Sequence, residues 1–139
     1  MQNQFVDLKD IDSLDRFFEL SNETAVVIFK HSETCGISDR AYREMSDLAR
    51  RLSALSNGQA LRIGIVQVQS SRDVSNEIEV RTGIDHESPQ VFVIAGRRVV
   101  WSSSHGGVRA EAIEKVWREA VSGTTRRVKG KRVRVNESL

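Results

Sequence analysis

A buried strand that leads directly into a long amphipathic helix is the feature that most constrains the fold of this chain. Ala25 to Phe29 is a continuous apolar run rich in β-branched residues, which is typical of a strand buried on both faces. After the segment KHSETC, apolar residues recur every three or four positions from Ile37 to Leu55, and Asn57-Gly58 ends the pattern. This order predicts a βαβ unit, in which the helix crosses over to a parallel strand.

The rest of the chain supplies the elements that would complete such a sheet. Asp10 or Asp12 can cap a short N-terminal helix. The further expected elements are a strand at 61–68, a short helix at 72–83, a hairpin at 90–103 that turns near Gly96, and a last helix at 108–121. The order predicts an α/β protein with the thioredoxin fold: βαβ-α-ββα, with a mixed four-stranded sheet flanked by helices and an extra N-terminal helix.

Length and charge divide the chain into a body and a tail. With 139 residues and a hydrophobic fraction of 39%, we expect one compact domain over residues 1–123. Residues 124–139 carry six Lys or Arg side chains against one Glu, and we expect them to form a basic, disordered tail. Such a tail could contact nucleic acid or an anionic surface, but it has neither aromatic residues nor a defined binding motif, which favours a solvated end.

The apolar pattern also bears on location. No apolar run is longer than Ala25 to Phe29, and the start MQNQFVDLKD has neither a basic leader nor an apolar core segment. We therefore expect a cytoplasmic protein that makes no use of a membrane.

Cys35 is the only cysteine of the chain, and its position suggests reactivity. It lies between the expected strand and helix, where free N–H groups and the positive end of the helix dipole favour a thiolate over a thiol. Three positions later, where dithiol oxidoreductases have their second cysteine, the chain has Ser38, so the motif is CxxS. Without a second thiol, a mixed disulfide on Cys35 must be released by a thiol from elsewhere.

Several other residues could surround Cys35. Lys30 and His31 add positive or titratable character, although both, like Ser38, can equally be ordinary structural or solvated residues. Gly106-Gly107 would let a ligand carboxylate approach the N–H groups at the start of the last helix, or would form a plain turn. The histidines have no spacing that suits a metal, and one cysteine cannot complete a zinc site, so we assign no metal.

Two segments resemble the monothiol bacilliredoxins of the bacillithiol system: FKHSETCGIS at 29–38, and HESPQVFVI at 86–94 followed by VVWSSSHG at 99–106. The resemblance extends over roughly residues 5–120. It implies a thiol-disulfide oxidoreductase that removes bacillithiol or a related small thiol from S-thiolated proteins. That small thiol would be the co-substrate, and no cofactor would be tightly bound.

The resemblance also implies roles for particular residues. Cys35 would be the nucleophile, and Ser88-Pro89 would form the cis-proline element, in which Ser88 offers its backbone to the incoming thiol compound. The resemblance also places Lys30, His31, Ser32 and His86 around the site without fixing a role for each. From the resemblance and the residue patterns together, the residues expected to contact the substrate are Lys30, His31, Thr34, Gly36, Ser38, Gly106 and Gly107.

One position departs from the family pattern. Gly36 stands where bacilliredoxins usually have proline, and the resulting CGIS is similar to the CGFS of monothiol glutaredoxins. Those proteins carry a [2Fe–2S] cluster between two subunits, with a small thiol as co-ligand, but their conserved lysine lies farther upstream than Lys30. A cluster carrier is therefore the second hypothesis. A thioredoxin-fold binding module with an inert cysteine is the third.

The position of Cys35 generates a direct prediction. We expect its pKa to be lower than that of an unperturbed thiol, because the start of a helix and nearby Lys30 both favour negative charge. Alkylation rate measured against pH gives the midpoint. A midpoint equal to that of a cysteine-containing model peptide, alkylated alongside, would contradict the prediction.

Overall fold

The computed structural model describes residues 5–32, 36–52 and 61–126. The elements follow in this order: β1 (Val6–Asp7), α1 (Ile11–Leu20), β2 (Val26–His31), α2 (Gly36–Leu52), β3 (Ile63–Gln67), α3 (Arg72–Thr82), β4 (Gln90–Ala95), β5 (Arg98–Ser104), the 3-10 helix η1 (His105–Gly107) and α4 (Ala110–Arg126).

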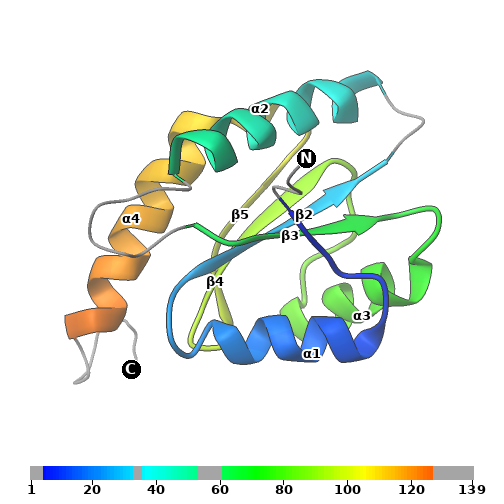
Figure 1. The fold of residues 1–139 in the computed structure, drawn as a ribbon. Coiled ribbons are helices and arrows are strands. Elements are labelled where there is room, and N and C mark those ends of the chain that lie inside the picture. Colours follow the sequence, from blue (N-terminus) through cyan, green and yellow to red (C-terminus); the bar gives the residue numbers. More distant parts are fainter. Residues whose placement is uncertain (1–4, 33–35, 53–60, 127–139) are drawn as a thin grey trace.

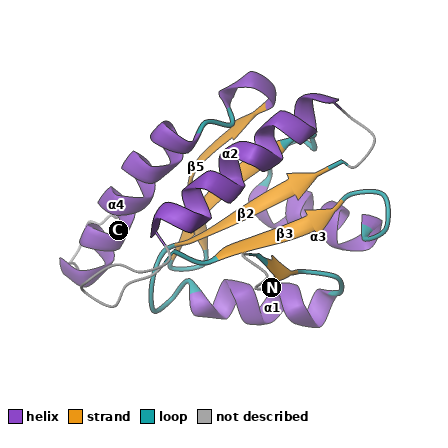
Figure 2. Cartoon of the chain, turned by 45° about the horizontal axis from the view of Figure 1, so that its top comes forward, coloured by secondary structure: helices purple, strands orange, loops and turns teal. Residues whose placement is uncertain are grey.

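The strands form one mixed sheet in the order β1-β3-β2-β4-β5. β1, β3 and β2 are parallel, whereas β4 is antiparallel to both of its neighbours. Helices α2 and α4 cover one face, and α1 and α3 cover the other (Figures 1 and 2). Strand β2 is central, which is why all six of its residues are buried.

The predicted four-stranded sheet was wrong by one strand. Val6 and Asp7 form β1, which pairs with Gly64 and Ile65 of β3. Two residues are too few to show a period-two pattern, and both side chains are exposed, so no apolar signal marks this edge strand.

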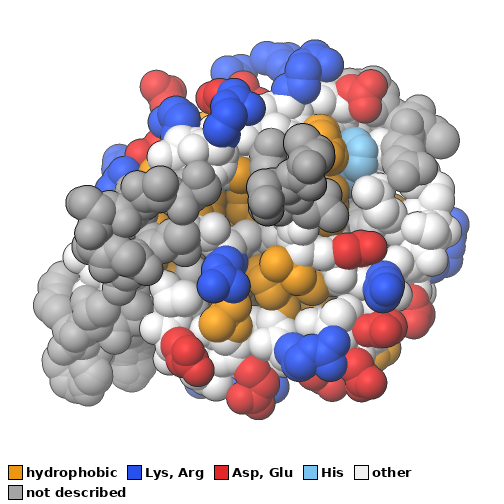
Figure 3. Space-filling view, in the orientation of Figure 1, with side chains coloured by type: hydrophobic (Ala, Val, Ile, Leu, Met, Phe, Trp, Pro, Cys, Tyr) orange, Lys and Arg blue, Asp and Glu red, His pale blue; other side chains and the backbone are white. Residues whose placement is uncertain are grey.

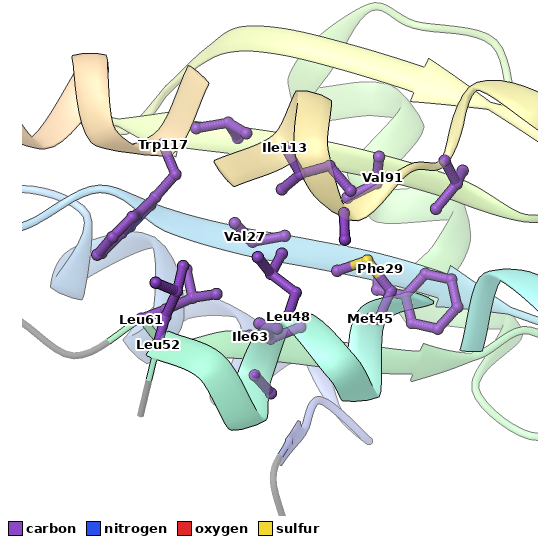
Figure 4. Packing of buried hydrophobic residues seen from close by; sticks show 14 of the residues in the cluster. Val27, Phe29, Met45, Leu48, Leu52, Leu61, Ile63, Val91, Ile113 and Trp117 are labelled. Carbon is purple, nitrogen blue, oxygen red and sulfur yellow. The ribbon is translucent and has the colours of Figure 1, made fainter. Parts of the chain in front are cut away.

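Alternation along the strands divides the core into two layers. On the α2 and α4 side, Val27 and Phe29 of β2 pack with Met45, Leu48 and Trp117 (Figure 4). Trp117 is almost fully buried, and its indole Nε1 donates to the Ala25 carbonyl oxygen at 2.9 Å. The opposite layer holds Leu14, Phe17 and Phe18 of α1 with Val74 and Ile78 of α3.

Helix boundaries follow the sequence signals closely at two of the expected ends. Asp10 is the N-cap of α1, and its carboxylate accepts from the Ser13 backbone N–H at 2.8 Å. Gly83 ends α3 in the left-handed conformation with φ of 72°.

Two boundaries differ from the expectation. Helix α4 continues to Arg126, because Gly123 keeps a helical backbone instead of the left-handed conformation that stops a helix. The expected boundary between residues 123 and 124 therefore lies inside α4. Strand β2 extends two residues past Phe29, so Lys30 and His31 belong to the strand and not to a connection.

Within the described ranges, none of the helices combines the length and the apolar character needed to cross a lipid bilayer.

The close packing of Leu8 and of Phe17 in α1 against Gly64 of β3 leads to a prediction about stability. A Cβ on Gly64 would lie 2.6 Å from Leu8 Cδ1 and 3.0 Å from Phe17 Cε2, and both side chains are buried. We expect Gly64→Ala to lower the free energy of unfolding by about 1–3 kcal/mol through overpacking. Urea unfolding measures this change.

Gly106→Ala is the matched control, because nothing lies within 4 Å of the position that its Cβ would take and its φ is not positive. Its free energy of unfolding should change by less than about 0.5 kcal/mol. Equal effects of the two substitutions would contradict the packing argument.

Candidate functional site

The last two residues of β2 are polar, buried and directed to opposite faces of the sheet. Lys30 is fully buried and His31 is 5% exposed. Lys30 follows the alternation of Val26 and Ile28 toward α3, whereas His31 follows Val27 and Phe29 toward α2. Each therefore contacts a different element: Lys30 bonds Ser75 of α3, and His31 bonds Ser38 at the start of α2.

On the α2 side, His31 and Ser38 are hydrogen-bonded. Ser38, in the first turn of α2, is fully buried, and its Oγ lies 2.8 Å from His31 Nδ1. The same Oγ accepts the Ser32 backbone N–H at 2.9 Å. The His31 ring also packs against Tyr42, with centroids 5.0 Å apart. Ser38 thus ties the end of β2 to the start of α2, across the segment that contains Cys35.

On the α3 side, the Lys30 ammonium is held by oxygen and nitrogen acceptors. Its Nζ donates to the Ser75 carbonyl oxygen at 3.0 Å and lies 3.2 Å from His86 Nδ1. The Phe92 ring centroid lies 5.9 Å away. Burial lowers the pKa of Lys30 to about 8, and the negative charge of Glu79 partly opposes this shift.

The loop before β4 contains the expected cis-proline. The Ser88-Pro89 peptide bond is cis. The Pro89 carbonyl oxygen accepts the His105 backbone N–H at 2.9 Å, so this loop is joined to η1. Ser88 Oγ is buried and has no hydrogen-bond partner within the part of the chain that the structure describes.

The Gly106-Gly107 pair lies in η1, just before α4. A Cβ on Gly107 would lie 2.2 Å from Ser103 Oγ, so a side chain at this position requires the Ser103 hydroxyl to rotate away. The Ala110 backbone N–H at the start of α4 is already engaged, since it donates to the Glu44 carboxylate of α2 at 2.7 Å. Glu44 thus occupies part of the helix start at which a ligand carboxylate was expected.

Two of the expected site residues, Cys35 and Thr34, lie outside the described residues, and Gly36 is described only as the first residue of α2. The structure brings Lys30 close to His86, and His31 close to Ser38. Ser88 and Pro89 are joined to η1, which contains Gly106 and Gly107.

Sequence reasoning missed three polar residues that support this site: Glu44, Gln69 and Gln90. Gln69 Nε2 donates to Ser32 Oγ at 2.7 Å, and Gln90 is buried opposite Lys30 in the sheet. Only Gln90 could have been recognised from the sequence, because it is a polar residue at the start of the apolar strand QVFVI.

The outer face of α2 is basic. Its exposed arginines are Arg40, Arg43, Arg50 and Arg51. Figure 3 shows Lys and Arg side chains gathered where α2 lies in Figure 1. Asp47 neutralises part of this charge through Arg50, at 2.7 Å. The outer face of α2, which begins at Gly36, therefore has a moderate positive charge.

A thioredoxin-fold sheet, a cis-proline loop and a lone cysteine before α2 together define a thiol oxidoreductase of the thioredoxin class. The family is also clear. The model of the monothiol bacilliredoxin BrxC family matches residues 6–113, and the chain belongs to this family.

Solved structures agree with this assignment. A protein described as a candidate oxidoreductase with a thioredoxin fold is 32% identical, with a TM-score of 0.68 over 79% of this chain and 90% of that chain. The thioredoxin of Fasciola hepatica is 13% identical, with a TM-score of 0.65 over 84% of this chain and 99% of that chain. The thioredoxin of Trypanosoma brucei brucei is 12% identical, with a TM-score of 0.66 over 85% and 91%. The two thioredoxins support the fold alone.

The buried hydroxyl of Ser38 makes a second stability prediction. Ser38→Ala removes the acceptor of the Ser32 N–H and the partner of His31 Nδ1, both of which are buried. We expect a loss of about 1–3 kcal/mol in the free energy of unfolding. Ser46→Ala, on the same helix and only half-buried, should cost less than about 0.5 kcal/mol. Equal losses in chemical denaturation would show that the Ser38 hydrogen bonds do not stabilise the fold.

Proposed function

We propose that this protein is a monothiol enzyme that removes a low-molecular-weight thiol, bacillithiol or an analogue, from mixed disulfides of protein cysteines. Cys35 is the nucleophile. The observation that carries the proposal is the state of Ser38: the residue at the position of a resolving cysteine is a fully buried serine whose oxygen bonds Ser32 and His31. Neither a thiol nor a free hydroxyl is available there.

The reaction has two exchange steps, each of which forms and breaks one S–S bond. In the first, the Cys35 thiolate attacks the small-thiol sulfur of the mixed disulfide, and the target protein leaves as its thiolate. Cys35 is then capped by the small thiol. In the second, the thiolate of another small-thiol molecule attacks the capping sulfur, which releases Cys35 and a symmetric small-thiol disulfide. The two steps together conserve sulfur atoms and electrons.

The cis-proline loop supports the binding of such a substrate. We infer that the Ser88 backbone pairs with the small thiol attached to Cys35. Ser88 is partly exposed, so an extended substrate can reach it.

The test uses a model protein that carries one small thiol in mixed disulfide linkage. We expect wild-type protein to release the target thiol and to gain the mass of one small thiol on Cys35. Cys35→Ser should abolish both signals. Ser38→Ala, assayed where it is folded, should retain most of the exchange, because no resolving residue takes part.

Three results would contradict this proposal. One is a loss in Ser38→Ala as complete as that in Cys35→Ser. Another is an unmodified Cys35 mass after reaction with the mixed disulfide. The third comes from purification without oxygen: a dimer with stoichiometric iron and sulfide, together with no capped monomer after oxidant treatment, would favour the cluster carrier instead.

A further inference from the structure

A lysine at the centre of the sheet takes no part in the exchange steps above. Lys30 is fully buried, and no carboxylate within the described residues forms an ion pair with it. An ammonium buried without a paired carboxylate is costly, because desolvation is only partly offset by neutral acceptors. The Lys30 ammonium has two acceptors. One is the carbonyl oxygen of Ser75 in α3, and the other is Nδ1 of His86, which lies three residues before Pro89.

Buried side chains from two strands hold the segment 85–87 in front of the cis-proline. Gln90 lies opposite Lys30 in the β2–β4 pairing. Its Nε2 donates to the Asp85 carbonyl oxygen at 3.0 Å, and its Oε1 accepts the Glu87 backbone N–H at 3.1 Å. His86, between these two residues, contacts Lys30 Nζ through its Nδ1 at 3.2 Å and Ser75 Oγ at 3.3 Å, and its backbone N–H donates to the Glu79 carboxylate at 3.3 Å. Three successive residues are therefore fixed, and the contact with Lys30 is the shorter of the two that the His86 ring nitrogen makes.

We propose that Lys30 is a positioning residue, which holds the cis-proline loop through the neutral ring of His86 and makes exchange at Cys35 depend on the charge states of these two side chains. The expected effect on the exchange rate rests on the proposed function, whereas the contact between Lys30 and the His86 ring does not depend on it.

The contact between Lys30 Nζ and His86 Nδ1 requires one particular protonation state of the His86 ring. An ammonium has donors only, so Nδ1 must carry the lone pair and the ring proton must be on Nε2. If His86 takes a second proton, two donors face each other across 3.2 Å and the contact breaks. Burial and the positive charge of Lys30 lower the pKa of His86, so the contact persists to a more acidic pH than it would for a free imidazole.

The surrounding charges set the limits of this interval. Glu79 and Glu87 favour protonation of His86, and Arg72 opposes it. Lys30 loses its proton as the pH rises through about 8, and its charge-assisted hydrogen bonds then weaken. The contact is therefore strongest between the lowered pKa of His86 and about 8.

Two substitutions separate positioning from folding. Lys30→Met keeps an apolar stem of similar length and removes the charge. Because the native pKa of Lys30 lies below its unfolded value, its protonated form disfavours folding below about pH 8, and this substitution should leave the Tm unchanged or raise it. His86→Asn keeps an acceptor near the position of Nδ1 that does not titrate. Lys115→Met, at an exposed site, is the control.

Two readouts are compared across pH 5–9. The first is the exchange rate divided by the rate of Cys35 alkylation at the same pH, which removes the titration of the thiol itself. The second is hydrogen-exchange protection of the peptide 84–90, corrected for intrinsic rates, which requires no activity.

We expect Lys30→Met to lower the exchange ratio about tenfold at pH 7 and to reduce protection of 84–90, with Lys115→Met unchanged. Wild-type protein should lose both signals at acidic pH, whereas His86→Asn should keep its neutral values there. The proposal would be overturned if peptide 84–90 were as protected in Lys30→Met as in wild type. It would also be overturned if both signals decreased at acidic pH in His86→Asn as much as in wild type. If wild-type protein shows no exchange at all, only the proposed function is contradicted. The hydrogen-exchange protection of peptide 84–90 then decides whether Lys30 positions the loop.

Discussion

The burial of β2 on both faces is the constraint on which the rest of this structure depends. A strand hydrogen-bonded on both edges and covered by helices on both faces has almost no contact with water, so each polar side chain on it must find a partner within the protein. Lys30 and His31 are adjacent, and alternation directs them to opposite layers. One is bonded to the loop before the cis-proline, and the other to the start of α2. The two parts of the site are thus fixed to a single strand.

Local signals in the sequence were enough to predict most of the fold. The helix cap, the Gly83 stop and the apolar run of β2 each act within a few residues. The structure has the stop and the run where the pattern placed them, and it selects Asp10 from the two predicted caps, Asp10 and Asp12. Strand β1 could not be predicted, because a two-residue strand at a sheet edge exists only through its pairing with β3. The end of β2 was misplaced because a polar pair is typical of a loop, unless buried partners are available.

The site could be predicted only in part, for the same physical reason. Residue types near Cys35 and the single proline predicted a site formed by the end of β2, the start of α2 and the loop before β4, and the structure shows that the Ser88-Pro89 bond in that loop is cis. The partners of these residues come from distant positions: Lys30 bonds Ser75, which is 45 positions away, and Glu44 bonds the Ala110 N–H, which is 66 positions away. Polar side chains on helix surfaces are common, and nothing local distinguishes those that reach a buried donor from those that face water.

The CxxS motif is often described by what it lacks, but here the serine has a role of its own. Ser38 Oγ accepts a backbone N–H at 2.9 Å in a fully buried position. A thiol is larger and is a weak acceptor, so a cysteine at this position would leave the Ser32 N–H poorly satisfied. Hydrogen bonding at the start of α2 therefore opposes the second thiol of a dithiol enzyme. The hydrogen bonds of Ser38 thus favour serine over cysteine at this position, and in the proposed reaction a capped Cys35 is released by a thiol from solution.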